Sequence, residues 1–146
     1  MASSAITGIN FFFKKPISLY QRKRLKKYIA RVFSRRNLAL EGLNYIFCSD
    51  KDILEINLRY LKHDYYTDIL SFSLGSKGGP IIGEIYISVD RVRENAGKLN
   101  QTFKKELHRV MFHGILHFCG YVDRTKKQKD EMRKAEDALL SAYFTS

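Results

Sequence analysis

The sequence lacks any hydrophobic run close to the ~20 residues that a membrane-spanning helix requires, and it has no internal repeat or low-complexity tract. Its first residues lack the charged region and hydrophobic core of a secretion signal. Cysteine is scarce: Cys48 and Cys119 form no paired motif, which favours buried thiols in a reducing compartment. These absences predict a cytoplasmic protein, and a length of 146 residues suits one domain, 1–146, with its own core.

Acidic residues are also missing from the N-terminal quarter, where none occurs before Glu41. Ten basic residues fall in that stretch: Lys14, Lys15, Arg22, Lys23, Arg24, Lys26, Lys27, Arg31, Arg35 and Arg36. The net charge of +11 therefore resides almost wholly in the first 36 residues. Such a surface suits a polyanion, because neutralised phosphates release counterions. We expect a nucleic acid as partner; a solubilising surface and an anionic membrane surface are the alternatives.

Residues 110–125 contain two histidines, His113 and His117, in an otherwise largely apolar stretch. Residues four apart project from the same face of a helix. A helix that is apolar nearly all round is typically buried. The pattern predicts a central buried helix with two imidazoles side by side, which indicates a metal site; a chance pairing of histidines is the alternative.

A third ligand is predicted beyond the end of this helix. Gly120 is placed to end the helix in a left-handed conformation, so that Asp123 can return toward His113 and His117. Three protein ligands with an open fourth position are typical of catalytic zinc. Asp123 could instead cap the next helix, but Thr125 and the residue three positions later already supply a capping box.

The glutamate of the zinc protease motif His-Glu-x-x-His is absent, because Gly114 occupies its position. Glycine cannot accept a proton, so peptide hydrolysis by that mechanism is disfavoured. Gly114 could also allow another element to pack closely on the helix, despite its low helix propensity.

The remaining patterns predict an α+β fold: a mixed sheet of about four strands, about five helices and one central buried helix that carries the metal ligands. Strands are predicted over residues 6–13, 42–48, 68–74 and 81–88, the last two as a hairpin. Helices are predicted over 18–34, 51–61, 88–97, from 102 to the bend at 120, and 125–142, with caps at Ser18, at Ser49 or Asp50, at Thr102 and at Thr125.

The sequence HGILHFCGY, residues 113–121, resembles the signature of the bacterial YbeY proteins, single-strand endoribonucleases and rRNA maturation factors. Asn57, Tyr60, TDILSF at 67–72 and GEI at 83–85 match the family in order and spacing. The resemblance covers about residues 40–135. It implies a zincin-like α+β fold, one zinc ion, and cleavage of single-stranded RNA in 16S rRNA 3′-end maturation and ribosome quality control in the cytoplasm.

Two residues depart from the family pattern. Asp123 stands where the family usually has a third histidine, so a bound zinc would carry less net charge, its water would be less acidic, and Mn²⁺ would compete better. Leu61 stands where the family usually has an arginine that the resemblance links to RNA cleavage. Arg59 is two positions away, which on a helix points elsewhere.

Arg109 is the candidate replacement, because Glu106, Arg109, His113 and His117 share one helical stripe. We predict His113 and Arg109 as catalytic residues, with Arg109 holding a phosphate beside the metal; an ion pair with Glu106 is the alternative. Asp68 and His63 are weaker candidates to orient ligands. Besides an endoribonuclease, the sequence allows a ribosome-binding assembly factor with a structural metal, or a metallohydrolase on another substrate.

Overall fold

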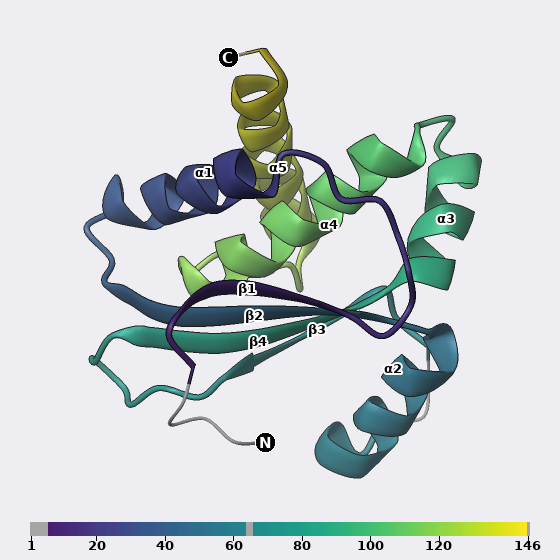
Figure 1. The fold of residues 1–146 in the computed structure, drawn as a ribbon, viewed down its shortest axis with the longest axis horizontal. Helices are drawn as coiled ribbons and strands as arrows, with labels where there is room; N and C mark the ends of the chain where they lie inside the picture. Colours follow the sequence, from purple (N-terminus) through teal and green to yellow (C-terminus); the bar gives the residue numbers. More distant parts are fainter. Residues whose placement is uncertain (1–5, 64–65, 146) are drawn as a thin grey trace.

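The computed structural model describes residues 6–63 and 66–145, which form a four-stranded sheet, five α-helices and one π-helical turn (Figure 1). In chain order these are β1 (Gly8–Phe13), α1 (Arg22–Ser34), β2 (Leu40–Cys48), α2 (Asp50–Ile56), the π-helix η1 (Asn57–Leu61), β3 (Ile69–Ser73), β4 (Ile81–Ser88), α3 (Val89–Lys98), α4 (Phe103–Phe118) and α5 (Lys126–Thr145). The expected α+β fold with a mixed four-stranded sheet is confirmed.

The sheet has the order β1-β2-β4-β3. Strands β1, β2 and β4 are parallel, and β3 runs antiparallel to β4 as the predicted hairpin. Figure 1 shows α1, α4 and α5 on one side of the sheet and α2 on the other. No helix in the described part of the chain combines the length and hydrophobicity that crossing a bilayer demands.

Strand β2 supplies side chains to both faces of the sheet, because successive residues of a strand point to opposite sides. Leu43, Tyr45 and Phe47 join the large core under the helices, and the Tyr45 hydroxyl donates to the Met111 carbonyl of α4 at 2.9 Å. Ile46 lies in a smaller cluster on the opposite face, against α2. The central helix is therefore anchored to the middle of the sheet.

Helix α4 has the predicted burial and the predicted ends. The Thr102 hydroxyl accepts from the Lys105 N–H at 3.1 Å, and the helix ends at a bend where Gly120 has φ +100°. A β-carbon at Gly114 would lie 2.8 Å from Cδ1 of Ile85 and 3.0 Å from Cδ1 of Ile69. The close packing expected at Gly114 is confirmed, and it brings the two histidines down onto the sheet.

Several predicted boundaries are wrong. The first helix begins at Arg22 instead of Ser18, since Gln21 has φ 52° and turns the chain so that Leu19 reaches the core. The helix predicted over 51–61 changes to π-helical hydrogen bonding at Asn57, with the Lys62 N–H bonded five residues back. The first strand starts at Gly8, and the last helix continues to Thr145.

His108 is a buried histidine on the side of α4 that faces the end of α5, and it makes stability depend on pH. Its Nδ1–H donates to the Lys104 carbonyl at 2.7 Å, and its ring stacks on Tyr143. Burial lowers the pKa of His108, and the positive charges of Lys104 and Arg24 lower it further, although the hydrogen bond opposes them.

As the pH falls below the unfolded-state value of about 6.5, the unfolded chain binds a proton that the folded chain excludes. Stability should therefore decrease from about pH 7 down to the folded pKa of His108, and His108 should contribute no pH dependence at higher pH. We expect a His108→Phe variant to show a shallower loss of melting temperature between pH 7 and 5 than the unaltered protein. Parallel curves for the two proteins would contradict this role.

Candidate metal centre

The three predicted metal ligands lie together at the C-terminal end of α4. Nε2 of His113 and Nε2 of His117 are 2.9 Å apart, and Oδ2 of Asp123 lies 3.3 Å from the first and 3.7 Å from the second. The bend at Gly120 reverses the chain, which brings the carboxylate back over the helix end. The edges of a tetrahedron with zinc–ligand distances of 2.0–2.1 Å are about 3.3 Å long, so the three donor atoms fit such an ion.

Hydrogen bonds fix which ring nitrogen faces the centre. His113 Nδ1 lies 2.6 Å from Oε2 of Glu136, and His117 Nδ1 lies 3.1 Å from the Tyr121 carbonyl. Both partners are acceptors, so each Nδ1 carries the proton and each neutral ring presents its Nε2 lone pair inward. Two lone pairs and a carboxylate at this separation repel one another unless a cation or a proton lies among them.

The two histidines have unequal proton affinities. Burial lowers the pKa of His113, but the hydrogen bond and charge of Glu136, together with Asp123 and Asp68, outweigh burial and raise the pKa overall. Burial and the charge of His113 lower the pKa of His117. A metal ion therefore competes mainly with one proton on His113, and its binding releases that proton.

Glu136 of α5 is the residue that the sequence prediction missed. It is buried, accepts from His113, and also lies 3.2 Å from Nη1 of Arg109 and 3.6 Å from Nη1 of Arg133. A signal was present, because Glu136 stands four residues from both Met132 and Leu140 on the buried stripe of α5. A carboxylate among apolar positions of a helix needs a charged or hydrogen-bonding partner.

Arg109 forms the ion pair with Glu106 that the sequence offered as the alternative, with Nε and Oε1 3.5 Å apart. It also reaches α5, where Nη1 lies 2.8 Å from Asp137 and 3.2 Å from Glu136. Its side chain is largely buried, so it joins α4 to α5 directly behind His113. The phosphate-binding role of Arg109 stays a prediction.

A cavity of about 500 Å³ opens over the three donors. Among the described residues it is lined by Thr67, Asp68, Ile69, Glu106, Arg109, Val110, His113, His117, Asp123, Arg133 and Glu136, and His63 is not one of them. Burial raises the pKa of Asp68, which enters from the start of β3. The cavity therefore brings the helix ends, the first residues of β3 and two arginines to one place.

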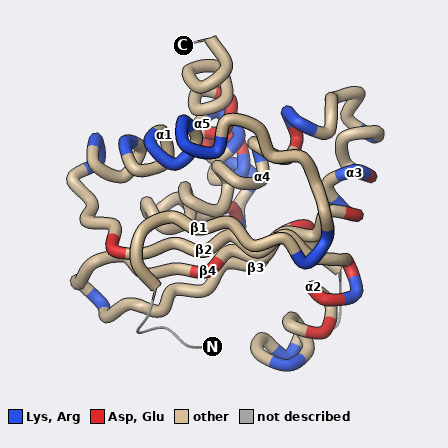
Figure 2. Tube along the Cα trace, in the orientation of Figure 1, with Lys and Arg blue, Asp and Glu red and all other residues tan. Residues whose placement is uncertain are grey.

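The basic residues of the N-terminal segment spread over β1 and α1, on the side of the sheet that also carries α5 (Figure 2). Lys15 pairs with Asp90 at 2.5 Å, whereas most of the others lie on α1. Leu61 is exposed at the end of η1, and Arg59 pairs with Glu55 at 3.2 Å. No described contact brings Arg59 into the cavity, so it does not replace the missing arginine.

A mixed α+β sheet with two histidines and an aspartate at the end of its central helix defines a protein with one candidate mononuclear metal centre. The sequence profile described as endoribonuclease YbeY matches residues 13–144. The chain belongs to the YbeY family.

Relatives support this assignment over most of the chain. A protein from Cytophaga hutchinsonii is 46% identical over 133 residues, which cover 90% of this chain and 93% of that protein. A protein from Christiangramia forsetii is 40% identical, covering 92% of this chain and 94% of its own length. Both are named endoribonuclease YbeY. The solution structure of a Thermotoga maritima protein is similar, with a TM-score of 0.62, 28% identity, and coverage of 94% of this chain and 92% of that one.

Proposed function

We propose that this protein is a metal-dependent endoribonuclease that cleaves single-stranded RNA, acting in the maturation of the 16S rRNA 3′ end and in ribosome quality control. One observation carries the proposal: His113, His117 and Asp123 converge in a chain that matches the endoribonuclease YbeY profile over residues 13–144. We place the protein in the cytoplasm, with rRNA and the ribosome as its partners.

Zinc is the proposed metal, with Mn²⁺ as the harder alternative. When bound, such an ion supplies Lewis-acid chemistry that polarises a phosphoryl oxygen. Glu136 holds the His113 ring, and the Tyr121 carbonyl holds the His117 ring, so both Nε2 atoms stay aimed at the centre. Asp123 completes the donor set from the far side of the bend.

The RNA backbone is bound by cations around the cavity. Arg133 lines it with about half of its side chain exposed, which suits a contact to a phosphate oxygen. Arg109 lies deeper and keeps its three carboxylate neighbours, so its contact to phosphate would compete with them. Helix α1 adds a wider positive surface that attracts the strand.

A ribosome-assembly factor with a structural metal is the second candidate, favoured by Leu61 at the position of the family arginine. A His113→Ala protein that still supports 16S 3′-end processing in cells would support this candidate. A peptidase is less suited to the site, because Ile85 and Ile69 fill the space that a glutamate side chain at position 114 would need.

Removal of the metal tests the proposed function. A chelator is expected to lower cleavage of a labelled single-stranded RNA by more than about a hundredfold, since a metal ion supplies several kcal/mol of transition-state stabilisation. Added Zn²⁺ should restore cleavage, and the same sequence in a duplex should remain intact. Equal cleavage with and without chelator would overturn the metal dependence, and no cleavage under any condition would overturn the nuclease assignment.

A further inference from the structure

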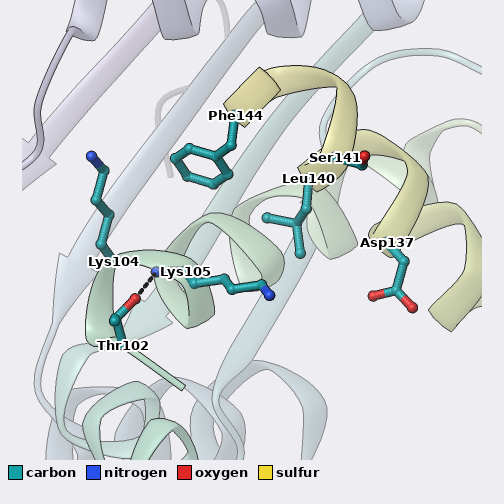
Figure 3. Close-up of a pocket in the computed structure, with 7 residues that line it drawn as sticks. All are labelled: Thr102, Lys104, Lys105, Asp137, Leu140, Ser141 and Phe144. Carbon is teal, nitrogen blue, oxygen red and sulfur yellow. Dashed lines mark hydrogen bonds between the residues drawn. The ribbon is translucent and has the colours of Figure 1, made fainter. Parts of the chain in front are cut away.

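A second cavity lies where the first turn of α4 meets the last turns of α5, and its volume is about 650 Å³. Its lining comes from both helices: Thr102, Lys104, Lys105, Asp137, Leu140, Ser141 and Phe144 (Figure 3). Except for Asp137, which bonds Arg109, none of these residues has a part in the candidate metal centre. In Figure 3 the Phe144 ring and Leu140 come from α5, and the two lysines come from α4.

The apolar part of this cavity presents an aromatic ring to solvent. Leu140 is buried, whereas Phe144 is 40% exposed. The Phe144 ring is held nearly perpendicular to the rings of His108 and Tyr143, with centroid distances of 5.0 and 5.1 Å. A ring fixed in this way can receive a flat partner with little loss of its own conformational entropy.

The polar part of the cavity is positively charged. The Nζ of Lys104 lies 5.6 Å from the Phe144 ring centroid, and Lys105 is exposed beside it. Within residues 6–63 and 66–145, neither amine lies within ion-pair distance of a carboxylate, whereas Asp137 is already bonded to Arg109 at 2.8 Å. Two amines beside an exposed aromatic ring match the phosphate and base of a nucleotide.

The cavity continues the candidate metal centre along the same pair of helices. The Arg109–Asp137 ion pair joins the two, since Arg109 lines the first cavity and Asp137 lines the second. Lys105 and His113 are eight residues apart on α4, or about 12 Å along the helix axis. An RNA strand held at the metal centre would thus reach the second cavity with a neighbouring nucleotide.

We propose that this second cavity binds one nucleotide of the single-stranded RNA substrate, with its base stacked on Phe144 and its phosphate held by Lys104 and Lys105. The inference rests on the proposed nuclease function, and it adds a subsite that positions the strand relative to the metal centre. Because stacking accepts every base, the subsite should favour unpaired RNA without selecting a sequence.

Substitution of Phe144 tests the base contact. We expect Phe144→Ser to weaken binding of a labelled 2′-O-methyl single-stranded RNA to the full, metal-loaded chain by about tenfold, because base–aromatic stacking is lost. Fluorescence anisotropy would measure binding. On unmodified RNA, KM should rise by a similar factor while kcat stays unchanged. Phe12→Ser is the matched control, since Phe12 is also an exposed phenylalanine but lies on β1.

Substitution of the two lysines tests the phosphate contact independently of the ring. Lys104→Gln with Lys105→Gln should reduce the slope of log affinity against log salt by about 1.4, as expected when two phosphate contacts to a single strand are lost. Both residues are exposed, so this variant should fold normally, which its melting temperature would verify.

The outcomes separate the subsite from the nuclease function. RNA cleavage with unchanged binding in both variants would overturn the subsite and leave the nuclease function intact. Phe144-dependent binding without cleavage would support the subsite and overturn the nuclease function. Failure of the unaltered protein to bind single-stranded RNA would overturn both.

Discussion

Replacement of His113 by alanine is expected to remove most bound zinc and to lower RNA cleavage by at least about a hundredfold. His113 supplies one of three donor atoms, and its Nε2 lies 2.9 Å from His117 and 3.3 Å from Asp123. Two remaining donors cannot hold the ion in a fixed position, and the loss should exceed the 10–100-fold effect typical of residues behind the ligands. Elemental analysis and an RNA cleavage assay on the same preparation would measure both effects.

Two variants serve as comparisons for this experiment. Asp123→His keeps three donors and should retain zinc, because it places the histidine usual for the family at the same bend. His108→Phe removes a histidine from the same helix on the side away from the cavity, and it should leave zinc content unchanged. If His113→Ala binds zinc as well as these two proteins do, the metal centre is not at His113.

Replacement of Glu136 by alanine is expected to have the second-largest effect, because two kinds of contact are lost together. The carboxylate accepts from His113 Nδ1 at 2.6 Å and pairs with the largely buried Arg109 at 3.2 Å. Loss of the first contact should weaken metal affinity by about 10–100-fold. Loss of the second leaves buried charge less well compensated and should cost about 3 kcal/mol of unfolding free energy.

Asp137→Ala is the matched control for Glu136→Ala. Asp137 is the next residue on α5 and bonds the same Nη1 atom of Arg109 at 2.8 Å, but its side chain is 57% exposed, against 6% for Glu136. An exposed ion pair contributes only about 0–1 kcal/mol, and Asp137 has no described contact with His113. Equal effects of the two substitutions on zinc affinity and on denaturant midpoint would show that Glu136 does not position the histidine.

The sequence predicted the metal ligands well because their signal is local. His113, His117 and Asp123 fall within eleven residues, so helix periodicity and one glycine bend determine their arrangement. The hairpin of β3 and β4 was predicted for the same reason, since its two strands are neighbours in the chain.

The residues that prediction missed act across long separations in the chain. Glu136 reaches His113 from 23 residues away, through the packing of α5 on α4, and no spacing rule specifies that contact. The π-helical bonding at Asn57–Leu61 and the left-handed Gln21 arise where tertiary packing overrides a regular helical pattern. Arg109 shows both sides, because its pair with Glu106 follows from spacing whereas its bonds to α5 do not.

Gly114 lies between the two histidines in sequence and against Ile85 in space, so one missing methyl group sets how far the donor atoms stand above the sheet. Any side chain there would lift this stretch of α4 and carry both imidazoles away from the first residues of β3. Core packing and coordination geometry are therefore mechanically inseparable at this position, and a change that relaxes one displaces the other.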